Sequence, residues 1–372
     1  MQHRHLLIIS SEFPPLPGGI GTHAYHLAKH LSFKGYKVRV IADQRSWDVQ
    51  EELAFDAELS FDVIRVPLRK VRGVMYAQRL QLLFESMRWA DVVLASGKFS
   101  LWSVAFMSNF VKRPLLAVVH GTEVNFKNPL LRYSIQKSLG FMGQIISVSK
   151  FTKRLLPGYL QRRTTVIPNG IEKAWGREAS KVKEFKGSPK LITVGHVSER
   201  KGQLHVIRAL PRLLASFPNL HYHCVGLATA QEPFEQEAKA LGVLEHVSFH
   251  GRVSEEELQG MLKTSNVFVM LSGMTQSGDV EGFGIAILEA NVLGIPAIGT
   301  KECGISDAIV SGRTGELVTL GDMEGLSQAL QRVLGDYDAY SKAAKGWALK
   351  HDWNMIVERY ISVIEREIGN KT

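Results

Sequence analysis

The segment EGFGIAILEA, residues 281–290, has residue types and spacing suited to binding a phosphorylated ligand. It follows an apolar strand candidate, Val267–Leu271, and a loop of small residues. In open α/β sheets, ligands bind beyond the carboxyl ends of the strands, and a helix start flanked by glycines, here Gly282 and Gly284, offers free backbone N–H groups to an anion. The helix dipole contributes only about 0.3–1 kcal/mol for an exposed anion, so a cation should assist. Arg200 and Lys201 follow another strand of the same half and could supply it, which predicts a pyrophosphate site.

Two glutamates, Glu281 and Glu289, are separated by seven residues in this segment. If the helix begins near Gly282, they stand about two turns apart on one face. Because phosphates repel carboxylates, we expect both to accept hydrogen bonds from sugar hydroxyls, Glu289 from a ribose and Glu281 from a transferred group. The alternative is an ordinary helix N-terminal charge and a solvated surface residue.

A second glycine-rich segment satisfies the dinucleotide fingerprint through Gly19, Gly21 and Ala24, with Asp43 at the distance of a ribose-binding acid. A dinucleotide site needs its first glycine directly after the strand. Here the loop 10–18, with three prolines, intervenes. We therefore interpret the match as accidental, which disfavours an oxidoreductase, and expect this stiff loop to form one wall of an active site, with glycine allowing close approach of substrate.

These candidate residues require parallel sheets to position them, and the chain alternates buried strands with helices in both halves. The fold class predicted is α/β, with two Rossmann-like domains facing each other across a cleft. We expect an N-terminal domain over residues 1–170 and a C-terminal domain over residues 171–352, with a polar linker at Glu172–Pro189 and a terminal amphipathic helix, about residues 353–372, packing back on the first domain. The expected strands are 6–10, 38–42, 92–95, 115–119, 145–148, 191–194, 222–225, 247–249, 267–271 and 296–299, and the expected helices are 22–33, 74–89, 202–215, 233–241, 254–263, 283–292 and 353–368.

Composition narrows the class of protein. The only two cysteines, Cys224 and Cys303, cannot form a disulfide framework. No apolar run approaches the roughly 18 residues that span a bilayer, and residues 6–9 are too short for the apolar core of a signal peptide. We expect a cytoplasmic protein.

Charge is distributed unevenly along the chain. The net charge is +9, yet residues 1–168 hold 23 Lys and Arg against 11 Asp and Glu, a balance of +12, while the remainder is −3. This asymmetry suggests that the first half meets an anionic partner, either a membrane surface or a phosphorylated or nucleic-acid partner. A helix packed on the core with a solvated basic face is an equal alternative. The candidate patch for membrane or acceptor consists of Arg65, Arg69, Lys70, Arg72 and Arg79.

Six motifs together resemble one enzyme family. They are FPPLPGGIG, HGTEV, SVSKF, IPNGI, GHVSERKG and EGFGIAILEA, and they extend from about residue 10 to about residue 318. In this order they resemble the retaining, nucleotide-sugar-dependent glycosyltransferases of the GT-B fold, in the group that includes sucrose-phosphate synthases and bacterial lipid and polysaccharide mannosyl- and glucosyltransferases.

The resemblance implies roles for particular residues. It makes Lys201 a contact of the donor diphosphate, with the backbone of residues 283–285 (Phe283, Gly284 and Ile285) beside it. His120, at a strand end, corresponds to the active-site histidine beside the donor sugar, although a lone loop histidine is more often structural. Gly18 and Gly19 correspond to the loop that closes over donor and acceptor. The chain departs from the family pattern at two places. His196 stands where many relatives have Arg, so that Arg200 would supply the second positive charge for the phosphates. Cys303-Gly304 replaces a common Gly-Gly pair.

The function implied is retaining transfer of a hexose from a nucleotide-diphosphate sugar, GDP-mannose or a UDP-sugar, to a lipid-linked or glycan acceptor in cell-envelope or polysaccharide synthesis. GDVEGFGI weakly resembles the GDP-mannose type. No cofactor and no metal are expected, because the only Asp-x-Asp, Asp336-Tyr337-Asp338, lies in a C-terminal helical region. The alternatives are a nucleotide-sugar 2-epimerase of the same fold and, more remotely, a basic nucleic-acid-binding protein, for which no recognition motif is present.

Overall fold

The computed structural model describes residues 4–176 and 185–369 and divides into two compact units. Unit 1 comprises Met1–Asn169 and Trp353–Thr372, and unit 2 comprises Gly170–Asp352. Of the polar linker predicted at Glu172–Pro189, residues 177–184 lie outside the described part of the chain.

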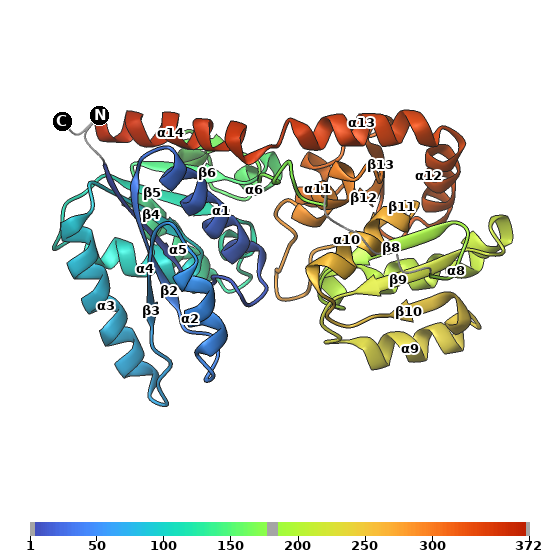
Figure 1. Ribbon diagram of the computed structural model, residues 1–372, viewed down its shortest axis with the longest axis horizontal. Coiled ribbons are helices and arrows are strands. Elements are labelled where there is room, and N and C mark those ends of the chain that lie inside the picture. The colour runs from blue at the N-terminus through green and yellow to red at the C-terminus, as the bar shows by residue number, and fades with distance from the viewer. Residues whose placement is uncertain (1–3, 177–184, 370–372) are drawn as a thin grey trace. The chain divides into compact units, whose positions relative to one another are not determined.

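Unit 1 is built on a seven-stranded parallel sheet in the order β3-β2-β1-β4-β5-β6-β7 (Figure 1). Its central strands are continuous apolar runs because helices cover both faces of a parallel sheet. The strands are β1 His5–Ser10, β2 Lys37–Asp43, β3 Asp62–Val66, β4 Val92–Ser96, β5 Leu115–Val119, β6 Gln144–Ser147 and β7 Thr164–Val166. The helices are α1 Gly19–Phe33, α2 Gln50–Ala57, α3 Arg72–Trp89, α4 Lys98–Met107, α5 Pro129–Gly140, α6 Lys150–Arg154, α7 Gly158–Gln161 and α14 Trp353–Gly369, with a 3-10 turn at Thr122–Val124.

Unit 2 repeats this plan with six parallel strands in the order β10-β9-β8-β11-β12-β13. The strands are β8 Lys190–Val194, β9 His221–Val225, β10 Val247–Phe249, β11 Val267–Met270, β12 Ala297–Thr300 and β13 Gly315–Val318. The helices are α8 Gln203–Ser216, α9 Gln231–Ala240, α10 Glu255–Thr264, α11 Ile285–Val292, α12 Met323–Gly335 and α13 Tyr337–Leu349, with 3-10 turns at Glu199–Lys201, Leu244–His246 and Gly304–Asp307.

The predicted α/β class with two parallel sheets is confirmed. Sequence patterns did not predict β3, β7 and β13, because these strands are short or lack an uninterrupted apolar run. Several helices were not predicted either. The patterns also placed the start of α11 two residues early. Gly284 has φ 87°, a left-handed conformation that glycine adopts without strain, so helical geometry begins only at Ile285.

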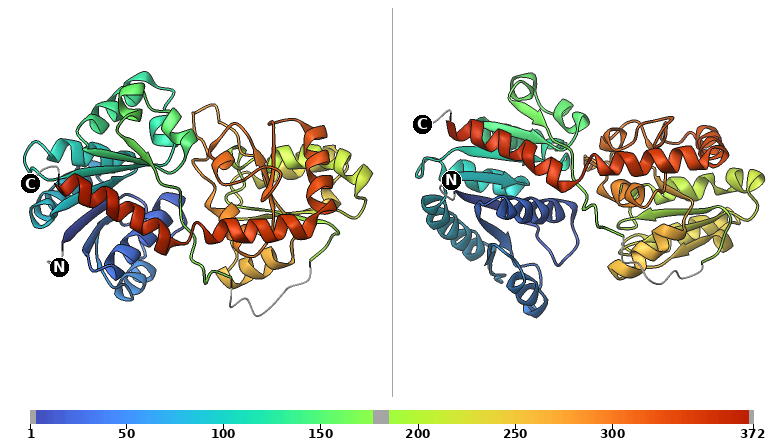
Figure 2. Two further views of the ribbon diagram at one scale, coloured as in Figure 1. Left: turned by 90° about the horizontal axis from the view of Figure 1, so that it is seen from above. Right: turned by 45° about the horizontal axis from the view of Figure 1, so that its top comes forward.

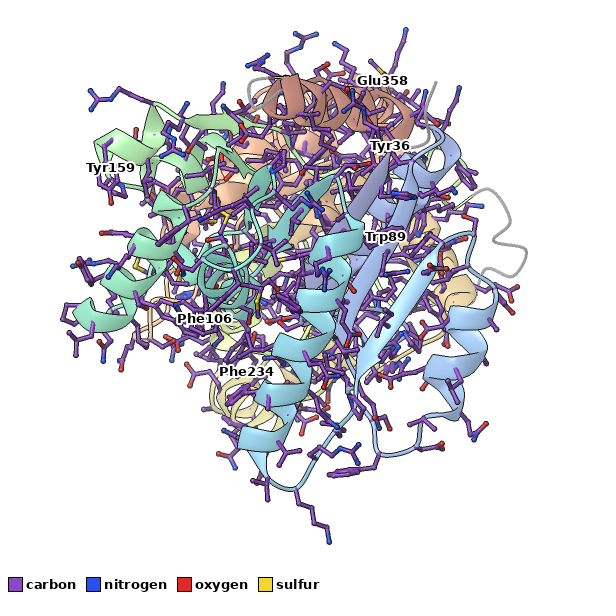
Figure 3. All side chains as sticks on the ribbon, turned by 90° about the vertical axis from the view of Figure 1, so that its left-hand side faces the viewer. Tyr36, Trp89, Phe106, Tyr159, Phe234 and Glu358 are labelled. Atoms are coloured by element: carbon purple, nitrogen blue, oxygen red, sulfur yellow. The ribbon has the colours of Figure 1, made fainter. Side chains whose placement is uncertain are left out.

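The last helix, α14, belongs to unit 1 and packs along α1 (Figures 1 and 2). Polar contacts support the apolar packing. The Tyr36 hydroxyl donates to Glu365 at 2.5 Å, and the Lys34 ammonium lies 2.5 Å from Glu358. Figure 3 shows Tyr36 beneath the helix that carries Glu358. The chain therefore returns to its first helix, and these two contacts lie in the turn between α1 and β2.

Candidate functional site

The order of strands in each sheet reverses at one point, and loops that follow the strands at this point carry candidate residues. In unit 1 the reversal lies at β1, which has β2 on one side and β4 on the other. His120 follows β5, one strand further along the sheet than β4. In unit 2 it lies at β8, between β9 and β11. Loops diverge at a reversal, so the carboxyl ends of the adjacent strands leave room for a ligand.

In unit 2 the glycine-rich loop and the basic turn after β8 are held together by hydrogen bonds. The Ser272 hydroxyl donates to the backbone carbonyl of Arg200, and the Thr300 hydroxyl donates to the carbonyl of Ser272 at 2.5 Å. At Gly202 a side chain is excluded, because a Cβ would lie 2.0 Å from the carbonyl oxygen of Leu271. The turn that carries the two cations is thus fixed against the end of β11.

Glu281 is paired with both predicted cations. Its carboxylate accepts from the Arg200 guanidinium, and the Lys201 ammonium lies 2.8 Å from the same oxygen. Burial acts to raise the pKa of Glu281, but the charges of Lys201 and Arg200 outweigh it and hold that pKa below its usual value. The predicted diphosphate cations are therefore brought together, with a carboxylate of the chain between them.

The two glutamates do not share a helix face, so that expectation is wrong. Because α11 begins at Ile285, Glu281 lies in the preceding loop, where its backbone carbonyl accepts from the Gly304 N–H at 2.9 Å. Glu289 lies on α11 and is partly buried. Burial first, and then the charge of Glu255, raise the pKa of Glu289 to about 7, while Lys201 opposes them. Glu281 is thus held ionised, whereas Glu289 is present in both its protonated and its ionised form near neutral pH.

The remaining predicted members of the phosphate site lie directly before and at the start of α11. Gly282 and Phe283 are buried, and the Phe283 ring lies 6.0 Å from the ring of His351. Gly284 caps the helix, which presents the N–H groups of its first turn from Ile285 onward. Gly304 closes against this loop, since a Cβ there would lie 2.0 Å from the carbonyl oxygen of Gly282.

In unit 1, His120 directly follows β5, beside the end of β4. Its Nε2 lies 2.9 Å from the Ser96 hydroxyl, and its backbone N–H donates to Glu123 at 2.5 Å. Burial lowers the pKa of His120 to about 4, so the ring is neutral at pH 7. Burial also raises the pKa of Glu123 to about 7, although the hydrogen bonds that its carboxylate accepts from backbone N–H groups act to lower this pKa. Sequence patterns alone did not identify Ser96 or Glu123. The position of Ser96 at the end of a strand, and that of Glu123 three residues after His120, are the signals that could have identified them.

The proline-rich loop before α1 is held by arginine side chains. Arg45 donates to the carbonyls of Leu16 and Pro17 at 3.0 and 3.1 Å. Gly18 immediately precedes α1 and Gly19 is its first residue. A Cβ at Gly18 would lie 2.3 Å from a carboxylate oxygen of Glu12, so the loop is tightly closed at that point. Arg45 thus connects the expected active-site loop to the segment that follows β2.

Two of the five cations predicted for the membrane or acceptor patch are not available to any such partner. Arg65 is largely buried and binds Asp56 at 2.7 Å and the Pro14 carbonyl at 2.6 Å. Arg79 is buried and binds both oxygens of Asp43 at 2.7 Å. Placing them in the patch was wrong, because each pairs with an acid on another element, Asp56 on α2 and Asp43 on β2, and the local sequence does not reveal these contacts.

Asp43, the acid of the accidental fingerprint, is thereby engaged in an internal ion pair with Arg79. The other three patch residues, Arg69, Lys70 and Arg72, are exposed around the start of α3.

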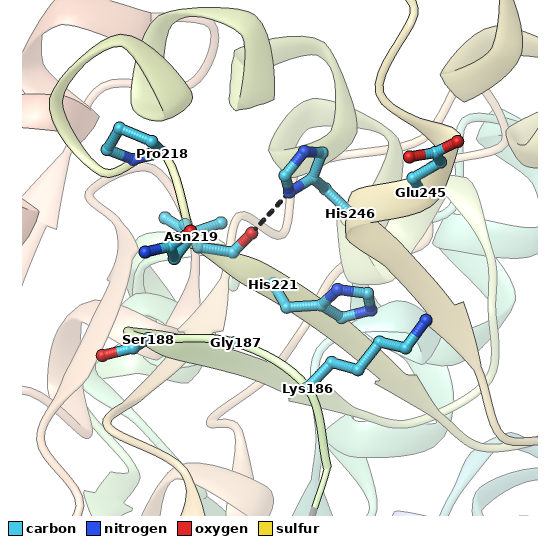
Figure 4. A pocket seen from close by; sticks show the side chains of 9 residues that line it. Lys186, Gly187, Ser188, Pro218, Asn219, His221, Glu245 and His246 are labelled. Carbon is cyan, nitrogen blue, oxygen red and sulfur yellow. Dashed lines mark hydrogen bonds between the residues drawn. The ribbon is translucent and has the colours of Figure 1, made fainter.

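A pocket in unit 2 lies at the opposite edge of the sheet from the glycine-rich loop. Its volume is about 460 Å³, and residues directly before β8, β9 and β10 line it, among them Lys186, Asn219 and His246 (Figure 4). Ligands of open α/β sheets bind at the carboxyl ends of the strands, whereas this pocket is at the amino ends. We therefore place the candidate phosphate site elsewhere, at the start of α11.

Family models match both halves of the chain. Residues 177–347 match the model described as Glycosyl transferases group 1, and residues 17–175 match Glycosyltransferase Family 4. The first range contains the paired cations and the glycine-rich loop, and the second contains the last two residues of the proline-rich loop and His120.

Curated relatives align along nearly the whole chain. The glycogen synthase of Mycobacterium tuberculosis is 26% identical over 375 residues, covering 91% of this chain and 88% of that protein. A GDP-mannose-dependent alpha-(1-6)-phosphatidylinositol monomannoside mannosyltransferase of Mycolicibacterium smegmatis is 26% identical over 364 residues. The alignment covers 92% of this chain and 94% of that protein. The second of these proteins is a mannosyltransferase by name.

Solved structures share the fold. Anabaena HepE in complex with UDP and glucose has a TM-score of 0.78 at 18% identity, covering 98% of this chain and 100% of that one. The sucrose-phosphate synthase of Thermosynechococcus elongatus has a TM-score of 0.79 at 18% identity, with full coverage of both chains. The architecture is accordingly that of the GT-B glycosyltransferases.

Proposed function

The chain belongs to the group 1 glycosyl transferases, and from this premise we propose that it transfers a hexose, with retention of anomeric configuration, from a nucleotide-diphosphate sugar to a lipid-linked or glycan acceptor. GDP-mannose is one candidate donor, because a mannosyltransferase relative is named as GDP-mannose-dependent. A UDP-sugar is the other, since the HepE structure holds UDP and glucose.

The observation that carries this proposal is the pair of cations beside the glycine-rich start of α11. Lys201 and Arg200 converge on a single carboxylate oxygen, so two positive charges lie within reach of one anionic group. A departing nucleotide diphosphate could be stabilised by both cations and by the free N–H groups of α11. Such stabilisation lowers the barrier for breaking the sugar–phosphate bond through an oxocarbenium-like transition state.

In this proposal the chain supplies no covalent nucleophile. Glu281 and His120 hold the transferred sugar, Glu289 holds the ribose, and the acceptor proton passes to a donor phosphate oxygen. The neutral state of His120 at pH 7 suits hydrogen bonding to hydroxyl groups. Because the two cations can carry the diphosphate charge, we also propose that transfer needs no metal. Trapping a sugar ester on Glu281, or loss of turnover in a chelator, would contradict these assignments.

The proposal is tested by a donor screen. Melting temperatures with GDP and UDP identify the base, since a ligand at 100 times its dissociation constant stabilises by about 2.7 kcal/mol. Incubating the matching nucleotide sugar with phosphatidylinositol or oligosaccharide acceptors, with products analysed by NMR, then reports transfer and anomeric configuration. Lys201→Met should abolish the nucleotide-induced shift, whereas Lys239→Met, an exposed lysine on α9, should not. Formation of an epimeric nucleotide sugar would instead indicate an epimerase.

We propose further that the start of α3 contacts an anionic membrane. Arg69, Lys70 and Arg72 are exposed beside Val71 and Val74, whose exposed fractions are 63% and 48%. Basic residues near an anionic leaflet contribute about 1 kcal/mol each, and neighbouring apolar side chains can enter the headgroup layer. Among the helices described, none is long and apolar enough to cross a bilayer.

Co-sedimentation with phosphatidylserine vesicles tests this surface. Salt-sensitive binding should disappear when Arg69, Lys70 and Arg72 are all replaced by glutamine. Arg132→Gln, which removes an exposed arginine on α5, should leave binding intact. Equal binding by the triple variant and the unmodified protein would assign any attachment to another surface.

A further inference from the structure

A row of aromatic rings joins α1 to α14 within unit 1. His26 and His30 stack on Trp353 with ring centroids at 5.6 and 5.9 Å and interplanar angles of 17° and 19°. His23, one turn earlier on α1, lies 5.6 Å from the Trp353 ring and 5.7 Å from that of Tyr360. The C-terminal helix thus covers the histidine face of α1.

His23 is anchored to α14 by a hydrogen bond. Its Nε2 lies 2.8 Å from the Tyr360 hydroxyl, and its side chain is 1% exposed. Within the described residues its other nitrogen, Nδ1, is buried without a hydrogen-bond partner. An unsatisfied buried polar atom costs about 1–3 kcal/mol. Packing alone would be better served by phenylalanine, so this position suggests a use for an imidazole.

His23 also touches the active-site candidate. Its ring lies 5.1 Å from the His120 ring at an interplanar angle of 76°, an edge-to-face contact. Burial first, then the charges of His120 and His26, hold the pKa of His23 well below its usual value. Both rings of the contact are therefore neutral at pH 7, and protonation of either would be opposed by the other.

We propose that His23 is a positioning residue for His120 and that Tyr360 of the C-terminal helix holds His23 in place. The inference rests on the proposed function, in which His120 contacts the transferred sugar. Ser96 engages Nε2 of His120, and His23 restricts rotation of the ring plane, so Nδ1 keeps one orientation. Positioning of this kind matters because a displacement of about 1 Å at a reacting group can cost about a hundredfold in rate.

Three variants test the proposal. Tyr360→Phe removes only the hydroxyl, and His23→Phe keeps a ring but removes both nitrogens. His30→Phe is the matched control, because His30 is a buried histidine of the same helix that stacks on the same tryptophan. Melting temperatures establish that each variant is folded. If His23→Phe does not fold, Tyr360→Phe decides the outcome.

The first readout is independent of any donor. Long-range 15N–1H NMR reports the tautomer and the titration of His120, which should change in Tyr360→Phe and His23→Phe but not in His30→Phe. The second readout is kinetic. We expect kcat to fall about tenfold in Tyr360→Phe and about a hundredfold in His23→Phe, with donor KM within about twofold. His30→Phe should retain kcat within about twofold even where its melting temperature falls equally.

The outcomes separate this inference from the proposed function. Unchanged His120 signals in both test variants would overturn the inference, as would altered signals with unchanged kcat. If the unmodified protein transfers no sugar from any donor, the proposed function fails, and the NMR comparison alone shows whether His23 and Tyr360 control the state of His120.

Discussion

Replacing Glu281 by glutamine tests whether this carboxylate occupies the position of a diphosphate on Lys201 and Arg200. The side chains of Glu281 and Lys201 are 13% and 14% exposed, and Arg200 is 32% exposed. Hydrogen bonds to charged groups contribute about 1.5–3 kcal/mol, and partial exposure screens them, so we expect Glu281→Gln to destabilise unit 2 by about 2 kcal/mol. For a unit of this length the melting temperature should fall by about 4–8 °C.

A bound nucleoside diphosphate should reverse this loss. In the unmodified protein the phosphates must first separate Glu281 from its two cations, whereas in Glu281→Gln the cations are already available. The melting-temperature rise caused by saturating GDP or UDP should therefore be larger in the variant, by up to about 4–8 °C, which corresponds to about 2 kcal/mol. Transfer activity should nevertheless fall, because Glu281 no longer accepts hydrogen bonds from the sugar as a carboxylate.

Glu316→Gln is the matched control for this experiment. Glu316 is a buried acid of the same unit that accepts from the Tyr340 hydroxyl at 2.5 Å and pairs with Arg332 at 3.2 Å. Its loss should lower the melting temperature without altering the nucleotide-induced rise. The reasoning is refuted if the rise in Glu281→Gln is equal to or smaller than that in the unmodified protein.

Three further predictions concern stability and the conformation of the loops. Burial lowers the pKa of His223 to about 4, below the unfolded value of about 6.5, so its contribution to stability is present above pH 6.5 and lost as the pH falls toward 4. Urea denaturation should show a smaller loss between pH 7 and pH 5 in His223→Gln. Arg79→Gln removes the ion-pair partner of the largely buried Asp43 and should destabilise unit 1 by about 3 kcal/mol, whereas Arg72→Gln, at an exposed position, should change stability by less than about 0.5 kcal/mol in the same assay. Gly304→Ala should weaken GDP or UDP binding measured by calorimetry, because its Cβ would displace the carbonyl of Gly282; unchanged affinity would show that this contact does not shape the phosphate site.

Sequence patterns were sufficient for elements whose cause is local. The apolar runs at 6–10 and 115–119 form buried strands, because a parallel strand covered on both faces needs apolar side chains throughout. The prediction that Arg200 and Lys201 lie beside the glycine-rich loop also depended on a simple rule, since both loops follow neighbouring strands of one sheet. Short or interrupted strands such as β3 and β7 gave no comparable signal.

The sequence by itself determined the two parallel sheets, the family and the composition of the glycine-rich loop, all of which depend on residues close together in the chain. Only the tertiary structure showed that Arg65 and Arg79 form ion pairs with acids of the same unit and that Glu281 pairs with both Arg200 and Lys201. It alone also showed that His23 contacts both Tyr360 and His120. The free energy of a charge or an imidazole depends on its partner and its burial. Those partners lie up to 337 positions away in the chain, where no local pattern can indicate them.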